Sequence, residues 1–219
     1  MKTSDVIIVG SGASGLFNAL FLPQDYKVIV ITKKEVEESD SFLAQGGISA
    51  LKNPEDYDSY FEDTMKAGHY ENDKGAVEKM IKESPQIIQD LKDFGVRFDL
   101  KDGEIEFTRE GGHSTFRILH HEDLTGKEIT SHLYEEAKKR DNITIMENCT
   151  MIDIIEKDGE CKGIVYKDAD GNLDTIEAPD TVLATGGLGG LFKHSTNFRH
   201  LTADLSLIHI SEPTRRRGI

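Results

Sequence analysis

Cysteine is scarce in this sequence. Only Cys149 and Cys161 occur among 219 residues, and neither belongs to a CxxC pair. The sequence therefore predicts no disulfide framework and no cysteine-based metal or redox motif. Such sparse, isolated cysteines are typical of a reducing compartment, and we expect a cytoplasmic protein.

Long apolar runs and excess positive charge are also lacking. The first apolar run, Val6–Val9, is too short for a signal peptide or a membrane span. The 26 Lys and Arg residues against 40 Asp and Glu residues give a formal net charge of -14. This balance disfavours a nucleic-acid partner, because binding to phosphate backbones needs clustered cations. We expect neither a membrane nor a nucleic-acid partner.

The N-terminal segment combines a short apolar run with a glycine-rich turn. Val6–Val9 predicts a strand buried on both faces, and GSGASG at residues 10–15 follows it as GxGxxG. Lys27–Thr32 predicts a second buried strand, so Asp5–Thr32 forms a βαβ unit with a parallel sheet. Glycines let the backbone approach a pyrophosphate, and a helix N-terminus attracts anions. The pattern predicts a dinucleotide site, with a ligand-free tight turn as the alternative.

One expected feature of a nicotinamide dinucleotide site is missing. An acidic residue normally binds the ribose hydroxyls about 20 residues past the first glycine, but Thr32, Lys33 and Lys34 stand there. Nicotinamide dinucleotide is therefore disfavoured, although the nearby Glu35 leaves it open.

The middle of the chain predicts helices rather than sheet. A helical stretch covers Tyr60–Ala67, and Asp73 is expected to cap a helix with an apolar face. Ser84 and Pro85 predict the start of a separate helix that ends at Gly95. We expect the apolar stripes of these helices to be core, namely Val77, Met80, Ile81, Ile88 and Leu91.

The last third of the chain predicts one helix followed by strands. Thr125 and Glu128 suggest a capping box before a helix whose buried face carries Ile129, Leu133 and Ala137. The segments ITIM, MIDIIE and GIVYK, with two Asp-Gly turns, predict a small β-meander. TVLATGG predicts a last buried strand that ends at Gly186 and Gly187.

Four motifs together carry a family resemblance. VIIVGSGASGL, DSFLAQGGISA, TREGGHS followed by RILHHEDLTGKEI, and VLATGG occur in this order. The chain resembles the flavoprotein family of L-aspartate oxidase, succinate dehydrogenase and fumarate reductase, and it is most similar to the L-aspartate oxidases. The resemblance covers residues 5–204. It implies an α/β fold, with a Rossmann-like FAD-binding domain that has a parallel sheet, a helical insertion and a small β-meander.

The resemblance implies FAD as the cofactor and assigns contacts to it. The pyrophosphate turn, a lysine after the second strand, the loop around the flavin, a pair near the adenine end and a late glycine are the matching elements. These positions are Gly10, Ser11, Gly12, Ala13, Ser14, Gly15, Lys33, Asp40, Ser41, Phe42, Leu43, Ala44, Gln45, Gly46, Gly47, Thr150, Met151 and Gly186. Membrane-bound relatives carry a flavin-linked histidine where this chain has Asp40, so we expect non-covalent binding.

Glu110 is the candidate substrate-binding residue. Dehydrogenase and reductase relatives have an aromatic residue there, whereas this chain and the aspartate oxidases have glutamate. A carboxylate repels a dicarboxylate unless the substrate also carries a cation, as aspartate does. We expect Glu110 to pair with the substrate ammonium and to orient it for hydride transfer. The alternative is a surface ion pair between Glu110 and Arg109.

Other polar residues give weaker patterns. His113 is predicted either to donate to a substrate carboxylate or to satisfy the glycine loop. His120 and His121 predict no metal site, because adjacent side chains on an extended backbone point apart. Glu104 and Glu106 are expected to lie on one solvated face of a strand.

The tail differs from the family pattern. LSLIHISEPTR at residues 205–215 coincides with the translation of an adapter used in transposase-based DNA library preparation, so we expect residues 205–219 to be non-native. The resemblance places the capping domain and a proton-accepting arginine further along the family's chain. Expected segments are residues 1–50 and 125–204 for the FAD-binding domain and residues 51–124 for the helical insertion with the substrate-side loop.

The expected activity follows from the resemblance. It is the FAD-dependent oxidation of L-aspartate to iminoaspartate, the first step of NAD biosynthesis, with fumarate or oxygen as electron acceptor and quinolinate synthase as recipient of the product. We expect this chain to be an N-terminal fragment, inactive by itself. The alternatives are a soluble fumarate reductase or succinate dehydrogenase-like flavoprotein, and an inactive truncation that binds a dinucleotide.

Overall fold

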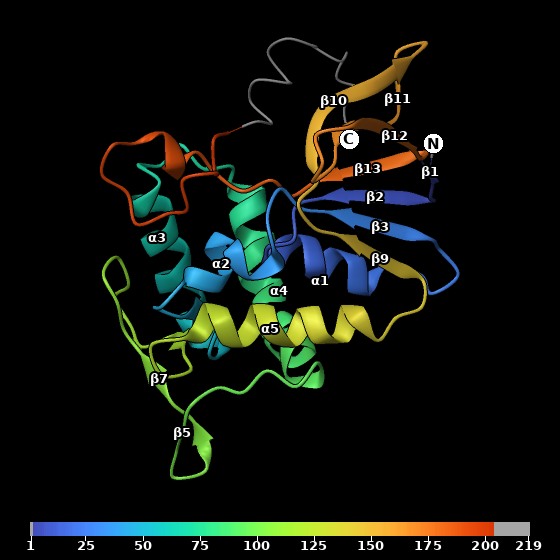
Figure 1. The fold of residues 1–219 in the computed structure, drawn as a ribbon. Helices are drawn as coiled ribbons and strands as arrows, with labels where there is room; N and C mark the ends of the chain where they lie inside the picture. The colour runs from blue at the N-terminus through green and yellow to red at the C-terminus, as the bar shows by residue number, and fades with distance from the viewer. Residues whose placement is uncertain (1, 204–219) are drawn as a thin grey trace. The chain divides into compact units, whose positions relative to one another are not determined.

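The computed structural model describes residues 2–203, so the predicted non-native tail lies outside the described residues (Figure 1). Its chain divides into two compact units. One comprises residues 2–43 and 133–203, and the other residues 44–132. Within the described residues, no helix is long and apolar enough to cross a membrane.

A parallel sheet forms the centre of the first unit. Its strand order is β13-β2-β3-β9, and every neighbouring pair is parallel. All residues of β2 and β3 are buried, as the continuous apolar runs predicted. Helix α1 follows β2 directly. These elements are β2 (Val6–Val9), α1 (Ala13–Phe21), β3 (Val28–Ile31), β9 (Ile143–Met146) and β13 (Asp180–Leu183). The predicted α/β fold with a Rossmann-like parallel sheet is confirmed.

A second, mixed sheet has the order β1-β12-β11-β10. Its antiparallel hairpins form the predicted meander, and the β10–β11 turn places Asp158 and Gly159 at φ +58° and +81°. The prediction was wrong for ITIM, because Ile143 pairs in parallel with Val28 and the segment extends the first sheet as β9. The strands are β1 (Lys2–Thr3), β10 (Thr150–Lys157), β11 (Glu160–Lys167) and β12 (Leu173–Glu177).

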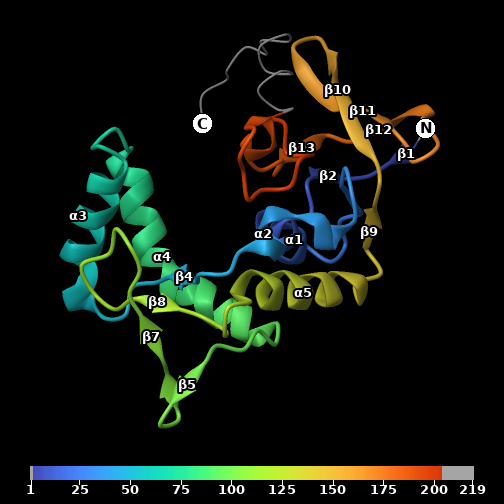
Figure 2. The same ribbon diagram turned by 60° about the vertical axis from the view of Figure 1, so that its left-hand side comes forward.

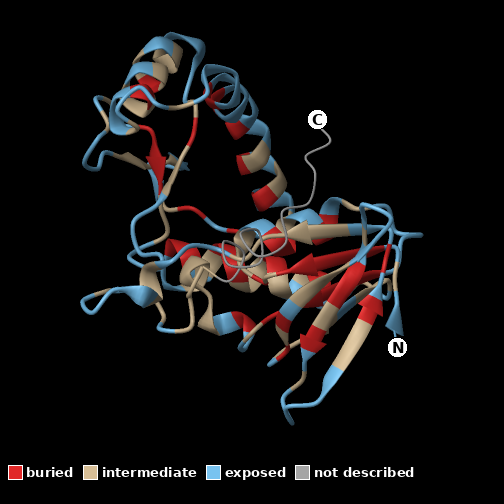
Figure 3. Ribbon diagram, turned by 90° about the horizontal axis from the view of Figure 1, so that it is seen from above, coloured by how far each residue is buried: buried red, intermediate tan, exposed pale blue. Residues whose placement is uncertain are grey.

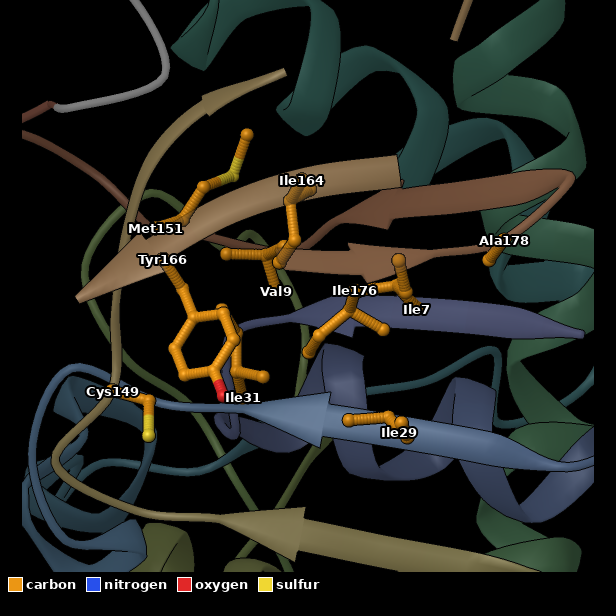
Figure 4. Packing of buried hydrophobic residues seen from close by; sticks show 10 residues of the cluster. All are labelled: Ile7, Val9, Ile29, Ile31, Cys149, Met151, Ile164, Tyr166, Ile176 and Ala178. Carbon is orange, nitrogen blue, oxygen red and sulfur yellow. The ribbon is translucent and has the colours of Figure 1, made fainter. Parts of the chain in front are cut away.

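The two sheets of the first unit share a core. Ile7, Val9, Ile29 and Ile31 of the parallel sheet pack against side chains of the mixed sheet (Figure 4). The opposite face of the parallel sheet packs against α1. Figure 3 shows the buried residues of the strands in red. Alternate strand residues thus enter two cores, which explains why the runs lack polar positions. The mixed-sheet contributors are Met151, Ile164, Tyr166 and Ile176.

Strand β13 departs from its prediction as a buried strand. Residues 181–183 are only half-buried, because β13 is the edge strand of its sheet. The glycines after it remain at the carboxyl end of the sheet, where Gly186 has φ +71°.

The second unit combines helices with short strands (Figure 2). Helices α3 and α4 pack through Tyr60, Met65, Val77 and Ile81. Strands β4, β8 and β7 form one small antiparallel sheet, and β5 pairs with β6 in a hairpin. The elements are β4 (Ile48–Ser49), α3 (Tyr57–Ala67), α4 (Lys74–Asp93), β5 (Leu100–Lys101), β6 (Glu104–Ile105), β7 (Phe107–Thr108), β8 (Ile118–Leu119) and α5 (Thr125–Lys138), which continues into the first unit. Short helical turns are η1 (Val36–Glu38), α2 (Asp40–Leu43), η2 (Pro54–Asp56) and η3 (Gly189–Leu191).

Helix α4 corrects the predicted helix break at Ser84 and Pro85. One helix runs from Asp73, whose side chain caps it, through Pro85 to Asp93. Proline cannot donate to the carbonyl of Ile81, but the Ser84 hydroxyl donates to that oxygen at 2.7 Å. The hydroxyl thus replaces the lost helical bond and lets the helix continue. The predicted core position Met80 is also wrong, because its side chain is exposed.

Ser84 should contribute measurably to stability. Its buried hydroxyl also accepts the Leu51 backbone N–H at 2.8 Å. We expect Ser84→Ala to lower the free energy of unfolding by about 1–3 kcal/mol, because it leaves both backbone groups without their partner. Urea unfolding measures the loss. Glu83→Ala, at an exposed neighbouring position, should change the free energy of unfolding by less than about 0.5 kcal/mol. Equal effects of the two substitutions would refute the role of Ser84.

The predicted capping box of α5 does not form. The Thr125 hydroxyl accepts the His121 N–H and donates to the Gly46 carbonyl, both at 3.0 Å. Glu128 instead accepts the backbone N–H of Arg97. Both side chains therefore bond groups that are distant in the sequence instead of capping the helix. The predicted buried face is confirmed, with Ile129, Leu133 and Ala137 all buried.

Candidate functional site

A cavity of about 410 Å³ lies at the carboxyl ends of β2, β3 and β13 in the first unit. This edge of a parallel sheet is where such folds bind nucleotides. Its lining comes from the glycine turn, the segments after β3 and β13, the start of β10 and the end of the described chain. The lining residues are 9–12, 14, 31–33, 38–41, 149–151, 183–187 and 200–203.

The glycine turn brings backbone very close to its neighbours. Gly10 has φ +113°, and a Cβ there would lie 2.1 Å from the Ala184 carbonyl oxygen. A Cβ at Gly15 would lie 1.9 Å from the Gly10 oxygen. These contacts explain why two positions of GxGxxG need glycine. A side chain at Gly10 would push the turn away from the end of β13, and a side chain at Gly15 would push α1 away from the turn.

The start of α1 presents donors to this cavity. Its N-cap, Gly12, supplies no side-chain hydrogen bond to the first turn. The Ser11 hydroxyl lines the cavity, is 2% exposed, and has no hydrogen-bond partner among residues 2–203. Buried hydroxyls are normally satisfied, and helix N-termini favour anions. The geometry therefore fits a bound phosphate group.

Most of the predicted cofactor contacts meet in this cavity. Ala13, Gly15, Phe42 and Leu43 lie outside its lining, and residues 44–47 belong to the second unit. The predicted residues that line it are Gly10, Ser11, Gly12, Ser14, Lys33, Asp40, Ser41, Thr150, Met151 and Gly186.

The last described segment supplies cavity residues that sequence reasoning missed. Lys33 Nζ donates to the His200 carbonyl at 2.9 Å and to the Thr202 hydroxyl at 3.0 Å. Asp40 accepts the backbone N–H of Phe198 at 3.0 Å and also bonds the Asn197 amide. Their partners lie more than 150 residues away in the chain, and no local sequence pattern marks them.

Cys149 was also missed as a cavity residue. Its side chain is buried, and burial raises the pKa of its thiol. The thiol therefore remains neutral and contributes apolar surface to the wall.

Glu110 lies in the second unit, on the loop between β7 and β8. A Cβ added at Gly46 would lie 2.9 Å from Glu110 Oε1 and 3.0 Å from Oε2, so the carboxylate rests against this glycine. Around it is an open groove with four acidic side chains and one histidine. The groove is lined by Gln45, Gly46, Glu106, Thr108, Glu110, His120, Glu122 and Asp123. Such a concentration of carboxylates favours a cationic group.

The ion pair between Arg109 and Glu110 does not form in the described part of the chain. The Arg109 guanidinium instead lies over the Phe116 ring, 5.8 Å from its centroid. Glu110 thus remains in the groove with its carboxylate beside Gly46.

His113 contacts an arginine. Its Nδ1 lies 3.1 Å from Arg117 Nη1, and its ring lies beside Tyr60. A guanidinium can only donate, so His113 Nδ1 is the acceptor in this contact. The His113 backbone N–H donates to the Glu110 carbonyl at 3.2 Å, which closes the glycine turn.

Arg117 is fully buried, and its partners were not predicted. Its guanidinium pairs with Asp56 at 2.8 Å and with Asp63 at 2.6 Å. The hydrogen bond from Arg117 holds the pKa of Asp56 far below its usual range. Burial by itself would raise the pKa of Asp63, but hydrogen bonds from Ser114 and Arg117 lower it overall. The bond to Asp56 in turn raises the pKa of Arg117, so all three groups are charged.

The paired histidines differ from expectation. His120 and His121 do not point apart, because their Nδ1 atoms lie 3.2 and 3.4 Å from the two oxygens of Asp99. Among residues 2–203, no group of three potential ligands is arranged to hold a metal ion. Glu104 lies on β6, whereas Glu106 falls between β6 and β7 and lines the acidic groove.

Comparison with known proteins agrees with this geometry. Residues 5–211 match the family model described as "FAD binding domain". L-aspartate oxidase of Clostridium perfringens is 44% identical over 203 residues, which cover 93% of this chain and 46% of that protein. The enzyme of Clostridium acetobutylicum is 46% identical over 92% of this chain and 46% of that protein. The chain thus spans about half the length of these curated relatives.

Solved structures share the fold. E. coli quinol fumarate reductase FrdA aligns with a TM-score of 0.91 and 27% identity, over 97% of this chain and 38% of that one. Mycobacterium smegmatis Sdh1 aligns with a TM-score of 0.86 and 29% identity, over 96% of this chain and 39% of that one. With a family match along most of its length, this chain belongs to the FAD binding domain family and is a homologue of the L-aspartate oxidases.

Proposed function

We propose that this chain is part of a flavoenzyme that oxidises L-aspartate to iminoaspartate. The observation that carries the proposal is the Glu110 carboxylate, held beside Gly46 in a groove with three further acidic side chains. The homology to L-aspartate oxidases supports the same substrate.

FAD is the proposed cofactor, and its pyrophosphate is assigned to residues 10–15. The open N-terminus of α1 and the unpartnered Ser11 hydroxyl supply donors for two phosphate groups. Lys33 adds a positive charge at the cavity wall. Asp40 cannot form the histidyl link expected of membrane-bound relatives, so we propose non-covalent binding. When bound, FAD supplies the acceptor for a hydride.

Glu110 is proposed to select the substrate by its charge. An acidic groove repels a plain dicarboxylate such as succinate, but it attracts the ammonium group of aspartate. Pairing with this ammonium would fix one end of the substrate and orient its Cα–H bond. Glu110 therefore acts by binding and orientation, and no proton transfer is assigned to it.

Glu110→Gln tests this role in an FAD-loaded enzyme of the full family length that contains this chain. Because a charge-assisted hydrogen bond to the ammonium is lost, we expect kcat/KM for L-aspartate to fall about tenfold or more. Fumarate reduction should change by less than about threefold, since fumarate has no ammonium to bind. Glu104→Gln, an exposed change outside the groove, is the matched control and should preserve the ratio of the two activities. Equal losses of both activities in Glu110→Gln would exclude the proposed pairing.

A soluble fumarate reductase or succinate dehydrogenase-like enzyme is the second candidate. It is favoured by the structural match to quinol fumarate reductase. Anaerobic bleaching of the flavin by L-aspartate, but not by succinate, would support the oxidase; the reverse would support this alternative. Bound flavin that neither substrate bleaches would instead favour a dinucleotide-binding remnant.

The remaining proposals follow from the homology. Fumarate or oxygen is the proposed electron acceptor, quinolinate synthase the proposed recipient of iminoaspartate, and the cytoplasm the proposed location. Residues 1–50 and 125–204 remain the proposed FAD-binding segments, and residues 51–124 the proposed insertion.

A further inference from the structure

Two carboxylates of the second unit hold the chain immediately after the Glu110 turn. Asp63 Oδ2 accepts the Ser114 backbone N–H at 2.7 Å and the Ser114 hydroxyl at 2.8 Å. Asp56 Oδ1 accepts the Thr115 hydroxyl at 2.7 Å. Asp56 immediately precedes α3 and Asp63 lies within it, 59 and 51 residues before their respective partners in the chain.

Arg117 joins the two carboxylates into one network. Its Nε and Nη2 bond the two oxygens of Asp56, each at 2.8 Å, while Nη1 bonds Asp63 at 2.6 Å. The same Nη1 lies 3.1 Å from His113 Nδ1. Every residue from His113 to Thr115 therefore has a side-chain bond to this network. We name the network of Asp56, Asp63 and Arg117 the carboxylate clamp.

The turn that carries Glu110 has little support of its own. Gly111 and Gly112 separate Glu110 from His113, and Gly112 has φ +86°. A Cβ added at either glycine would meet nothing within 4 Å, so the tip is not packed against other residues. Within the described part of the chain, the backbone bond across this turn joins the His113 N–H to the Glu110 carbonyl. Two successive glycines without packing would sample many conformations if only that bond held them.

We propose that Asp56 and Asp63 are positioning residues for Glu110. The clamp fixes His113 and Ser114, which hold one end of the glycine turn in place and leave the Glu110 carboxylate directed into the acidic groove. Neither aspartate touches the substrate: their oxygens are occupied by Arg117, Ser114 and Thr115. The inference rests on the proposed role of Glu110, because a fixed carboxylate matters only if it binds the substrate.

The charge state of the clamp suits this task. Two carboxylates around one guanidinium keep Arg117 fully paired, so it lends no positive charge to the acidic groove. The groove retains its preference for an ammonium group, and the turn gains rigidity without losing selectivity.

Asp63→Asn and Ser114→Ala test the clamp without removing the buried Arg117. Asp56→Asn is unsuitable, because it would break a bidentate pair with a buried cation and endanger folding. Hydrogen exchange of the His113 amide reports the Glu110 turn without direct contact with Asp63. We expect exchange about tenfold faster in both variants, because a charge-assisted bond that holds the turn is lost. Asp58→Asn, an exposed change on the same helix, should leave the exchange rate unchanged.

Substrate preference separates a positioning role from a structural one. In the FAD-loaded enzyme of the full family length that contains this chain, we expect Asp63→Asn to lower kcat/KM for L-aspartate about tenfold relative to fumarate, with an unchanged melting temperature of the first unit. Faster exchange with an unchanged preference would overturn the positioning role, provided that Glu110→Gln alters the preference. If Glu110→Gln leaves the preference unchanged, the proposed function itself fails. Unchanged exchange in both clamp variants would show that the clamp does not hold the turn.

Discussion

Replacement of Arg117 by methionine is expected to lower the free energy of unfolding of the second unit by about 3–5 kcal/mol. Methionine fills most of the space of arginine but leaves Asp56 and Asp63 without their cation. Both side chains are largely buried, 9% and 16% exposed. Two facing carboxylates in such surroundings repel each other and have lost their solvation. Urea unfolding, monitored by hydrogen exchange of amides in the second unit, measures the loss of stability.

Arg109→Met is the matched control for this prediction. Arg109 lies on the same loop, is exposed, and contacts Phe116 through a cation–π interaction. Its replacement should change the free energy of unfolding by less than about 1 kcal/mol. Similar small losses in both variants would contradict the account of Arg117 as the centre of the clamp.

The clamp also predicts how stability depends on pH. Folding lowers the pKa of Asp56 and Asp63. Their contribution to the stability of the folded protein is therefore fully present above the unfolded pKa of about 3.9, and it is lost as pH falls further. The second unit of the wild-type protein should therefore destabilise below about pH 4. In Arg117→Met this acid sensitivity should decrease, because protonation of the aspartates then relieves repulsion. A steeper loss of stability at low pH in Arg117→Met than in the wild-type protein would contradict the assignment of Asp56 and Asp63 as charged partners of Arg117.

The second large effect is expected from Gly15→Ala. The new Cβ would lie 1.9 Å from the Gly10 carbonyl oxygen and 3.0 Å from its carbon, both backbone atoms that no side-chain rotation can move. Helix α1 must then shift away from the glycine turn. We expect a destabilisation of about 3 kcal/mol or more and loss of FAD binding, because the donors at the start of α1 move with the helix.

Gly187→Ala provides the control for this clash. Gly187 lines the same cavity, but a Cβ there meets nothing within 4 Å. The FAD-free variant should unfold within about 0.5 kcal/mol of the wild-type protein. Thermal unfolding of both variants, and titration of each with FAD, test the pair. FAD binding of wild-type strength in Gly15→Ala would show that the close approach in the turn is dispensable.

The parts of the fold that follow from local pattern were predicted correctly. Val6–Val9 and Val28–Ile31, the apolar part of the predicted Lys27–Thr32 strand, are continuous apolar runs, and such runs form strands covered on both faces. The glycine turn was predicted because positive φ and close backbone approach at Gly10 restrict the residue type. Local pattern also identified the buried face of α5.

One error arises where a neighbouring side chain overrides a local pattern, and the others where distant partners do. Pro85 predicts a helix break, but the Ser84 hydroxyl replaces the missing bond. Thr125 has the sequence of a helix cap, yet its hydroxyl bonds the Gly46 carbonyl. ITIM resembles a meander strand, but the open edge of β3 pairs with it.

The candidate sites show the same limit. The glycine turn and Glu110 were identified from motifs, whereas Arg117 and its aspartates were not. Arg117 lies 61 positions from Asp56 and 54 from Asp63 along the chain. An arginine and two aspartates at such separations are indistinguishable from surface charges until the fold brings them together.

The most direct test of the account is titration of the full chain with FAD, followed by denaturation and filtration. We expect one FAD per chain, with quenched flavin fluorescence on binding, and complete release of the flavin into the filtrate after denaturation. Asp40, which stands in place of a flavin-linked histidine, and the open cavity at the start of α1 require both results. Flavin that stays attached to the denatured chain, or a chain that binds none, would contradict the central claim.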